Sequence, residues 1–130
     1  MKTLSEEVVF ECSADVLWKI LSDVTRCDWV PTVDTITLDG DCRVFEMEGM
    51  GRIAERILLL DNESKTLQYS AVETPAPIKH HLATMRVSKV DEEHCQLEWT
   101  TEIDPAAFAD GVLHGMLISI DGVKKLLLKE

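Results

Sequence analysis

Turn signals divide the middle of the chain at intervals that suit only short strands. Each of these signals contains at least one of Gly, Pro, Asp and Asn, the residues that favour turns. The signals are LDGD (38–41), EGMG (48–51), DNESK (61–65), ETPAP (73–77) and DEE (91–93). The stretches between them, from Val33 to Ile103, recur at about 8 to 12 residues, which is typical of an all-β meander. Because no helical pattern separates these stretches, they predict six antiparallel strands.

Helical patterns flank this meander on both sides. Residues 4–12 resemble one more strand, after which the apolar spacing becomes that of a helix with Ser13 as its N-cap. A second short helix or turn ends at Pro31, which cannot continue a regular helix. A long helix runs from Pro105 almost to the C-terminus. We therefore expect one α+β domain, 1–130, with about seven strands, two short helices after the first strand and a long C-terminal helix.

Small residues form a narrow stripe along the C-terminal helix. The stripe flanks an apolar face that includes Val112 and Met116, and its members are Gly111, Gly115, Ser119 and Gly122. A glycine inside a helix costs up to about 1 kcal/mol relative to alanine, so these positions need space. Two explanations fit: close packing against a neighbouring element, or an internal cavity whose volume the stripe supplies.

Charge and cysteine placement restrict the possible functions. Lys and Arg number 13 against 24 Asp and Glu, so the net charge of -11 repels nucleic acid and anionic lipid headgroups. The four cysteines form no C-x-x-C pair, and the N-terminus carries glutamates where a signal peptide would be apolar. The longest uncharged apolar run, 111–120, is about half of a membrane span. We expect a cytoplasmic protein that binds no nucleic acid and does not insert into membranes.

Three segments resemble the START/Bet v 1-like (SRPBCC) superfamily, specifically its polyketide cyclase/dehydrase and lipid transport branch. FECSADVLWKILSDVTRCDWVPTV (10–33) is similar to the family's opening, and LQYSAVETPAPIKHHLATMRV (67–87) and LEWTTEIDP (97–105) are similar to its middle. The best-matching residues are Trp18, Asp23, Trp29, Pro31, Tyr69, Pro77, Trp99 and Pro105. Ser13 departs from the pattern, because many relatives have proline there.

The resemblance implies a helix-grip fold, in which a curved sheet wraps round the long helix and leaves an apolar cavity between them. It favours the cavity explanation of the small-residue stripe. Loops matching EGMGR (48–52) and ETPAPIK (73–79) guard the entrance in relatives such as the plant abscisic acid receptors. The implied ligand is a small hydrophobic molecule such as a lipid, isoprenoid, quinone or polyketide, with no cofactor.

Strand alternation assigns the residues that face this cavity. On the strand after EGMG the inward set is Ile53, Glu55, Ile57 and Leu59. The predicted ligand-binding residues from all elements are Ile53, Glu55, Ile57, Tyr69, His81, Ala83, Met85, Trp99, Thr101, Phe108, Val112, Gly115, Met116 and Ser119.

Glu55, Tyr69 and His81 are the candidates for catalysis. A carboxylate in an apolar cavity needs a partner or becomes protonated, which suits a ligand anchor or a general acid; a surface position is the alternative for Glu55. A tyrosine hydroxyl can orient a ligand, although a core tyrosine bonded to backbone fits equally, and His81 is either a polar contact or a solvated strand-end residue. Neighbouring strand histidines face opposite ways, and His94 with Cys95 lacks a second pair, so we predict no metal site.

Three functions remain open on the sequence. The chain is a binding module, a cyclase or dehydratase that uses Glu55, Tyr69 or His81 as acid and base, or a cavity-poor interaction module that docks a partner or a second copy on the stripe. Cyclases of this superfamily typically use cavity arginines, whereas Arg52, Arg56 and Arg86 fall on the outward parity. The sequence therefore favours ligand binding, and it leaves the oligomeric state open.

Overall fold

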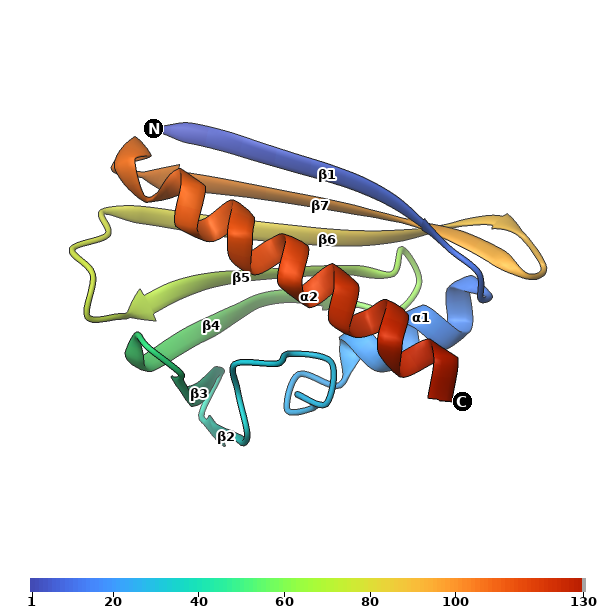
Figure 1. Cartoon of the computed structure of the whole chain (residues 1–130), viewed down its shortest axis with the longest axis horizontal. Helices are drawn as coiled ribbons and strands as arrows, with labels where there is room; N and C mark the ends of the chain where they lie inside the picture. Colours follow the sequence, from blue (N-terminus) through green and yellow to red (C-terminus); the bar gives the residue numbers. More distant parts are fainter. Residues whose placement is uncertain (130) are drawn as a thin grey trace.

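The computed structural model describes residues 1–129, and its seven strands form one antiparallel sheet. The strands are β1 (Lys2–Phe10), β2 (Ile36–Asp39), β3 (Cys42–Met47), β4 (Gly51–Asp61), β5 (Thr66–Glu73), β6 (His80–Asp91) and β7 (His94–Asp104), in the spatial order β1-β7-β6-β5-β4-β3-β2. The helices are α1 (Ala14–Ser22), the 3₁₀ helix η1 (Ala106–Phe108) and α2 (Ala109–Lys129). Figure 1 shows α2 lying across one face of the curved sheet, with α1 at one end. The predicted α+β helix-grip fold is confirmed.

The five turn signals lie between consecutive strands, as predicted. Gly40, Gly49 and Gly51 adopt positive φ angles of 61°, 81° and 105° on either side of β3, a region that side chains with a Cβ rarely enter. These glycines close the two hairpins that β3 makes with β2 and β4. The hairpin between β3 and β4 fixes the register that builds the site described below.

The segment after β1 contains one helix where two were expected. Ser13 caps α1 as predicted, because its hydroxyl accepts a hydrogen bond from the Val16 N–H at 3.2 Å. Residues 23–34 then form turns and bends. The Asp23 carboxylate accepts hydrogen bonds from the Thr25 N–H at 3.2 Å and from its hydroxyl at 2.9 Å. Such side-chain bonds compete with helix formation, and Pro31 prevents a helix from continuing.

The core is most tightly packed where α1 covers the sheet. Leu17 of α1 is buried with Phe10, Leu67, Met85 and Leu97 from four strands, and each of these side chains is at most 2% exposed. The Trp18 indole N–H donates to Asn62 Oδ1 at 2.9 Å and links α1 to the turn between β4 and β5. Side chains thus fill the space under this part of the sheet.

The C-terminal helix serves as the core helix of the fold. Residues Ala106–Lys129 are long and apolar enough to cross a membrane by length and composition alone. In the structure, however, α2 packs against the sheet and buries Met116, Ile120 and Val123. This is the arrangement of a soluble helix-grip domain, and the cytoplasmic location stays a prediction.

Candidate functional site

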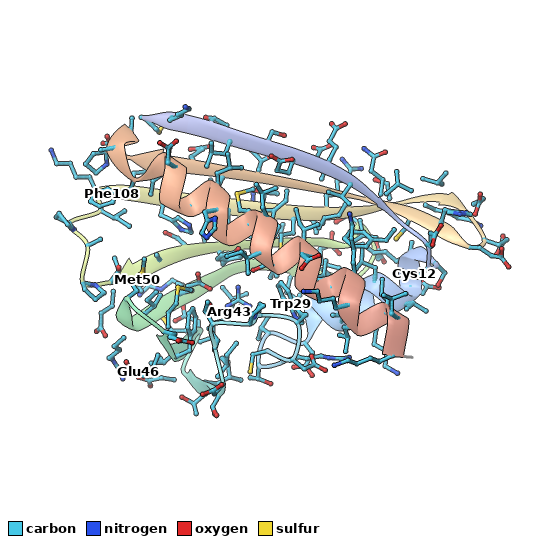
Figure 2. The ribbon with its side chains drawn as sticks, viewed as in Figure 1. Cys12, Trp29, Arg43, Glu46, Met50 and Phe108 are labelled. Atoms are coloured by element: carbon cyan, nitrogen blue, oxygen red, sulfur yellow. The ribbon has the colours of Figure 1, made fainter. Side chains whose placement is uncertain are left out.

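A cavity of about 680 Å³ lies between α2 and the part of the sheet that α1 does not cover. Eleven of the predicted ligand-binding residues line it: Ile53, Glu55, Tyr69, His81, Trp99, Thr101, Phe108, Val112, Gly115, Met116 and Ser119. The two segments expected at the entrance also contribute, through Met50 from one and Ile78 from the other. Figure 2 shows Met50 and Phe108 toward the same end of the molecule.

Three predicted residues lie outside the cavity wall. Ala83 and Met85 are 0% and 1% exposed within the packed core, although their partners on neighbouring strands, Tyr69 and Trp99, line the cavity. Ile57 is half-buried and packs against the same core. Leu59 is 41% exposed, which contradicts its inward assignment. A register shift between Ile57 and Leu59 changes the alternation at that point.

The small-residue stripe has two different environments along α2. A Cβ added at Gly111 or Gly115 meets no atom within 4 Å, and both glycines line the cavity. A Cβ at Gly122 lies 2.0 Å from the Trp29 carbonyl oxygen. Both explanations are therefore correct at different positions: the first two glycines supply cavity volume, and Gly122 permits close packing against the turns after α1.

An ion pair that the sequence analysis missed lies in the cavity wall. Arg43 Nε donates to Glu55 Oε1 at 2.8 Å, and the two side chains are 9% and 15% exposed. Arg43 and Glu55 are directly opposite on β3 and β4. The inward prediction for Glu55 is right, and Arg43 is the partner that a carboxylate in this environment requires.

Arg43 also binds the surrounding wall. Its guanidinium carbon lies 4.6 Å from the centroid of the Tyr69 ring, a cation–π contact, and Nη1 donates to the Val24 carbonyl at 3.4 Å. Figure 2 labels Arg43 and Trp29, which both line the cavity, alongside α2 in this view. Within residues 1–129, Nη2 of Arg43 has no hydrogen-bond partner. That nitrogen can donate to a molecule in the cavity.

The three outward arginines were assigned correctly, but Arg43 was not considered among the candidates for a cavity arginine. Arg52 pairs with Glu73 at 2.6 Å and Arg56 with Asp41 at 3.4 Å, both with side chains at least half exposed, and Arg86 is exposed. Arg43 nevertheless supplies the cavity arginine whose absence weighed against a cyclase. The cavity thus contains an arginine, a carboxylate and a tyrosine in contact.

Tyr69 is fixed in its neutral form. Burial raises the pKa of its hydroxyl well above the ordinary value, and the Glu55 carboxylate raises it further. The Arg43 charge and the nearby Trp99 indole lower this pKa, but they do not offset burial. Tyr69 therefore offers a hydroxyl that can donate a hydrogen bond, and it does not act as a base.

His81 is held in one tautomer. Its Nδ1 accepts a hydrogen bond from the Ala71 backbone N–H at 2.9 Å, so the proton of the neutral ring is on Nε2. Burial lowers the pKa of His81, against an opposing effect of Glu55, and the charge of His80 lowers it further. The ring lies 6.0 Å from the Tyr69 ring. His81 is therefore a neutral N–H donor, and this tautomer excludes the role of base that was considered for it.

We expect the stability of the protein to fall between about pH 7.5 and 5.5, and His81→Asn to reduce this fall. An unfolded histidine takes up a proton near pH 6.5. Because the folded-state pKa is lower, the folded protein resists that proton, and stability falls as the pH falls below this value. Asparagine keeps an acceptor for the Ala71 N–H without titrating. Urea unfolding at several pH values measures the difference.

His94→Gln is the matched control for this experiment. A hydrogen bond to Asp91 raises the pKa of His94, so this residue stabilises the fold below its unfolded pKa and loses that contribution as the pH rises. Replacing His94 should therefore reduce the free energy of unfolding at low pH more than at high pH, the opposite of the effect expected for His81→Asn. Parallel profiles for the wild type and His81→Asn would show that His81 is not held neutral.

The remaining titratable groups suggest no metal centre. Among the described residues, no group of three or more His, Cys, Asp and Glu side chains is arranged to hold a metal ion. His80 and His94 instead pair with Glu102 at 3.0 Å and Asp91 at 2.8 Å. The absence of a metal in the working protein stays a prediction.

A seven-stranded sheet that grips a helix around a cavity defines the helix-grip class of proteins. The family model described as polyketide cyclase / dehydrase and lipid transport matches residues 1–121, and the chain belongs to this family. No curated protein matches the chain. Membership in the family supports a role in ligand binding or in cyclisation.

Solved structures share this fold at low sequence identity. XoxI from Bacillus cereus has a TM-score of 0.87 and 20% identity, over 98% of this chain and 96% of that one. Truncated norcoclaurine synthase from Thalictrum flavum has a TM-score of 0.78 and 20% identity, over 99% and 94%. The di-domain ARO/CYC protein BexL from the BE-7585A biosynthetic pathway has a TM-score of 0.80 and 12% identity, and the match covers 96% of this chain and 46% of BexL. At these identities the likeness concerns the fold.

Proposed function

We propose that this protein binds a small hydrophobic molecule, of lipid, isoprenoid, quinone or polyketide type, in the cavity between α2 and the sheet. The observation that carries the proposal is the cavity itself. Its volume of about 680 Å³ falls within the range of roughly 300 to 1,000 Å³ that is usual for small-molecule sites. Apolar side chains make most of its wall, and Arg43, Glu55, Tyr69 and His81 form a polar cluster within it.

The position of the small-residue stripe supports binding over an interaction module. Gly111 and Gly115 line the cavity, and a Cβ added at either position would meet no atom within 4 Å. A stripe that docked a partner would instead be expected on the outer face of α2. A protein with a cavity of this size also does not match the cavity-poor alternative.

Gly115→Leu is expected to abolish binding of N-phenyl-1-naphthylamine, a neutral apolar probe that fluoresces when it leaves water. A Cβ at this position meets no atom within 4 Å and Gly115 lines the cavity, so the leucine side chain is expected to remove volume that the probe needs. The helix should be as stable as before or gain up to about 1 kcal/mol, because leucine is the better helix former. Probe titration and urea unfolding measure the two effects.

Lys124→Leu provides the control for this substitution. Lys124 is exposed on the same helix, so the variant adds an equal side chain outside the cavity and should bind the probe like the wild type. Unchanged probe binding by Gly115→Leu, or a loss of stability from overpacking of about 1 to 3 kcal/mol, would contradict the proposal.

A cyclase or dehydratase is the second candidate, and Arg43 is the observation that favours it. The guanidinium lies against Glu55 and Tyr69 within the cavity, and donors of this kind can stabilise an enolate oxygen that forms during cyclisation. Glu55 is then the base, because Tyr69 stays protonated and the His81 tautomer leaves no acceptor on Nε2.

Proton exchange separates these two candidates without knowledge of the natural substrate. Cyclisation and dehydration of a polyketide-like molecule begin with removal of a proton next to a carbonyl. A cyclase should therefore accelerate exchange of the methyl protons of 2-acetonaphthone with D₂O, which NMR can follow. A binding protein should leave the exchange rate unchanged while it retains the ketone.

A further inference from the structure

The charges in the cavity wall compensate one another. Arg43 and Glu55 form a direct ion pair with both side chains largely buried. The other charged residues of the wall are Arg26, which pairs with Asp28 at 2.7 Å, and Glu48, which is exposed to solvent. The positive charge of Arg43 is thus already balanced before any ligand enters.

The polar cluster in the cavity wall consists of Arg43, Glu55, Tyr69 and His81. Most of its unpaired hydrogen-bonding groups are donors. Within residues 1–129, Nη2 of Arg43, the Tyr69 hydroxyl hydrogen and the Nε2 proton of His81 have no hydrogen-bond acceptor, and neither does the buried indole N–H of Trp99. Glu55 Oε2 is the acceptor that no described residue occupies. All five residues line the same cavity. The cluster can therefore hydrogen-bond an oxygen atom while its net charge remains zero.

We propose that this cavity selects apolar molecules that carry a neutral oxygen group, such as a ketone or a phenol, and rejects carboxylates of the same size. The inference rests on the proposed binding function and adds the chemical class of the ligand's polar group. A ketone oxygen accepts hydrogen bonds from Arg43, Tyr69 or His81 at no cost in charge. A phenol hydroxyl can in addition donate to Glu55.

A carboxylate meets a different environment in this cavity. It must lose its hydration shell to enter an apolar space, and only an uncompensated cation could replace that shell. Glu55 lies at 2.8 Å from the guanidinium and repels a second anion beside it. The net charge of -11 on the chain opposes anions further. Glu55 thus determines specificity, because it cancels the charge that would otherwise attract an acid.

The test compares two molecules that share a ring system and differ in charge. In the wild type, 2-acetonaphthone should displace N-phenyl-1-naphthylamine with an affinity about tenfold or more higher than that of 2-naphthoate, the scale expected for one uncompensated charge in a partly desolvated site. Both titrations are done at about pH 7.5, where the acid is ionised.

Glu55→Gln shows whether the ion pair causes this preference. Glutamine keeps an oxygen that can accept from Arg43 Nε but removes the compensating charge, so affinity for 2-naphthoate should rise about tenfold or more while affinity for 2-acetonaphthone changes little. Glu73→Gln is the matched control. Glu73 also pairs with an arginine, but it lies outside the cavity and is 55% exposed, so its loss should leave both affinities unchanged.

Each outcome has a defined meaning. If the fluorescent probe itself fails to bind the wild type, the proposed function fails and the inference with it. If the probe binds but the ketone and the acid compete equally, or a folded Glu55→Gln variant gains no affinity for 2-naphthoate, the inference is wrong and the binding function stands. If Glu55→Gln does not fold, Arg43→Gln supplies the converse measurement. This variant should lower the affinity for 2-naphthoate more than the affinity for 2-acetonaphthone. An equal loss for both ligands would overturn the inference.

Discussion

Arg43→Met is expected to lower the free energy of unfolding by about 3 to 5 kcal/mol, the range measured when one partner of a buried ion pair is removed. The substitution leaves the Glu55 carboxylate, 15% exposed, without the cation that now lies 2.8 Å away. It also removes the cation–π contact with Tyr69. Methionine has a similar length, so the loss should arise mainly from charge rather than from an empty space. Urea unfolding measures it.

Two companion variants identify the ion pair as the cause. Arg52→Met breaks a pair that is equally short but lies on the surface, with side chains 57% and 55% exposed, and should cost about 1 kcal/mol or less. The double variant Arg43→Met/Glu55→Leu removes both buried charges and should recover most of the lost stability. Equal costs for Arg43→Met and Arg52→Met would show that the Arg43 pair behaves as a surface pair.

The turn chemistry of the chain was sufficient to predict the sheet. Gly40, Gly49 and Gly51 mark places where the backbone must adopt positive φ, and such positions constrain the chain locally, without reference to the rest of the fold. The capped start of α1 at Ser13 was predictable for the same reason. The prediction of a second helix was wrong for two reasons. The Thr25 hydroxyl donates a hydrogen bond to the Asp23 carboxylate, and the segment packs against α2 at Gly122. The contact with α2 is a tertiary effect that local sequence does not reveal.

Arg43 could have been found from the sequence. In the segment CRVFEM, Phe45 belongs inside, and alternation places Arg43 on the same face. A turn at 48–50 sets residues 47 and 51 opposite each other, and counting outward along both strands sets 43 opposite 55. The inward prediction for Glu55 therefore already implied its partner. Arg52, Arg56 and Arg86 lie on strands whose two faces were predicted, whereas no face was predicted for the strand CRVFEM.

The extent of the cavity was less predictable than its polar cluster. Alternation states which face a side chain occupies, but it does not state how far along the sheet the packed core extends. Ala83 and Met85 lie directly opposite Tyr69 and Trp99, which line the cavity, yet they are 0% and 1% exposed because other side chains of the core cover them. The register shift after Ile57 likewise depends on pairing with β5. Both features arise from contacts between elements that are distant in sequence.

Gly122→Ala is expected to lower the free energy of unfolding by about 3 kcal/mol, at the upper end of the cost of overpacking. A Cβ at this position lies 2.0 Å from the Trp29 carbonyl oxygen and 2.9 Å from its carbonyl carbon. These are backbone atoms, so the clash is relieved only if α2 moves away from the turns after α1. The higher helix propensity of alanine, up to about 1 kcal/mol, does not compensate for that displacement.

Gly115→Ala is the matched control, seven positions earlier on the same face of α2. Its new Cβ meets no atom within 4 Å, so this variant should be as stable as the wild type or gain up to about 1 kcal/mol. Gly122→Ala should also weaken binding of N-phenyl-1-naphthylamine, because Trp29 lines the cavity and must move with its backbone. Urea unfolding and probe titration of the two variants test this contrast. Equal stabilities would mean that Trp29 does not contact α2 at Gly122, and the stripe would then face open space along its whole length.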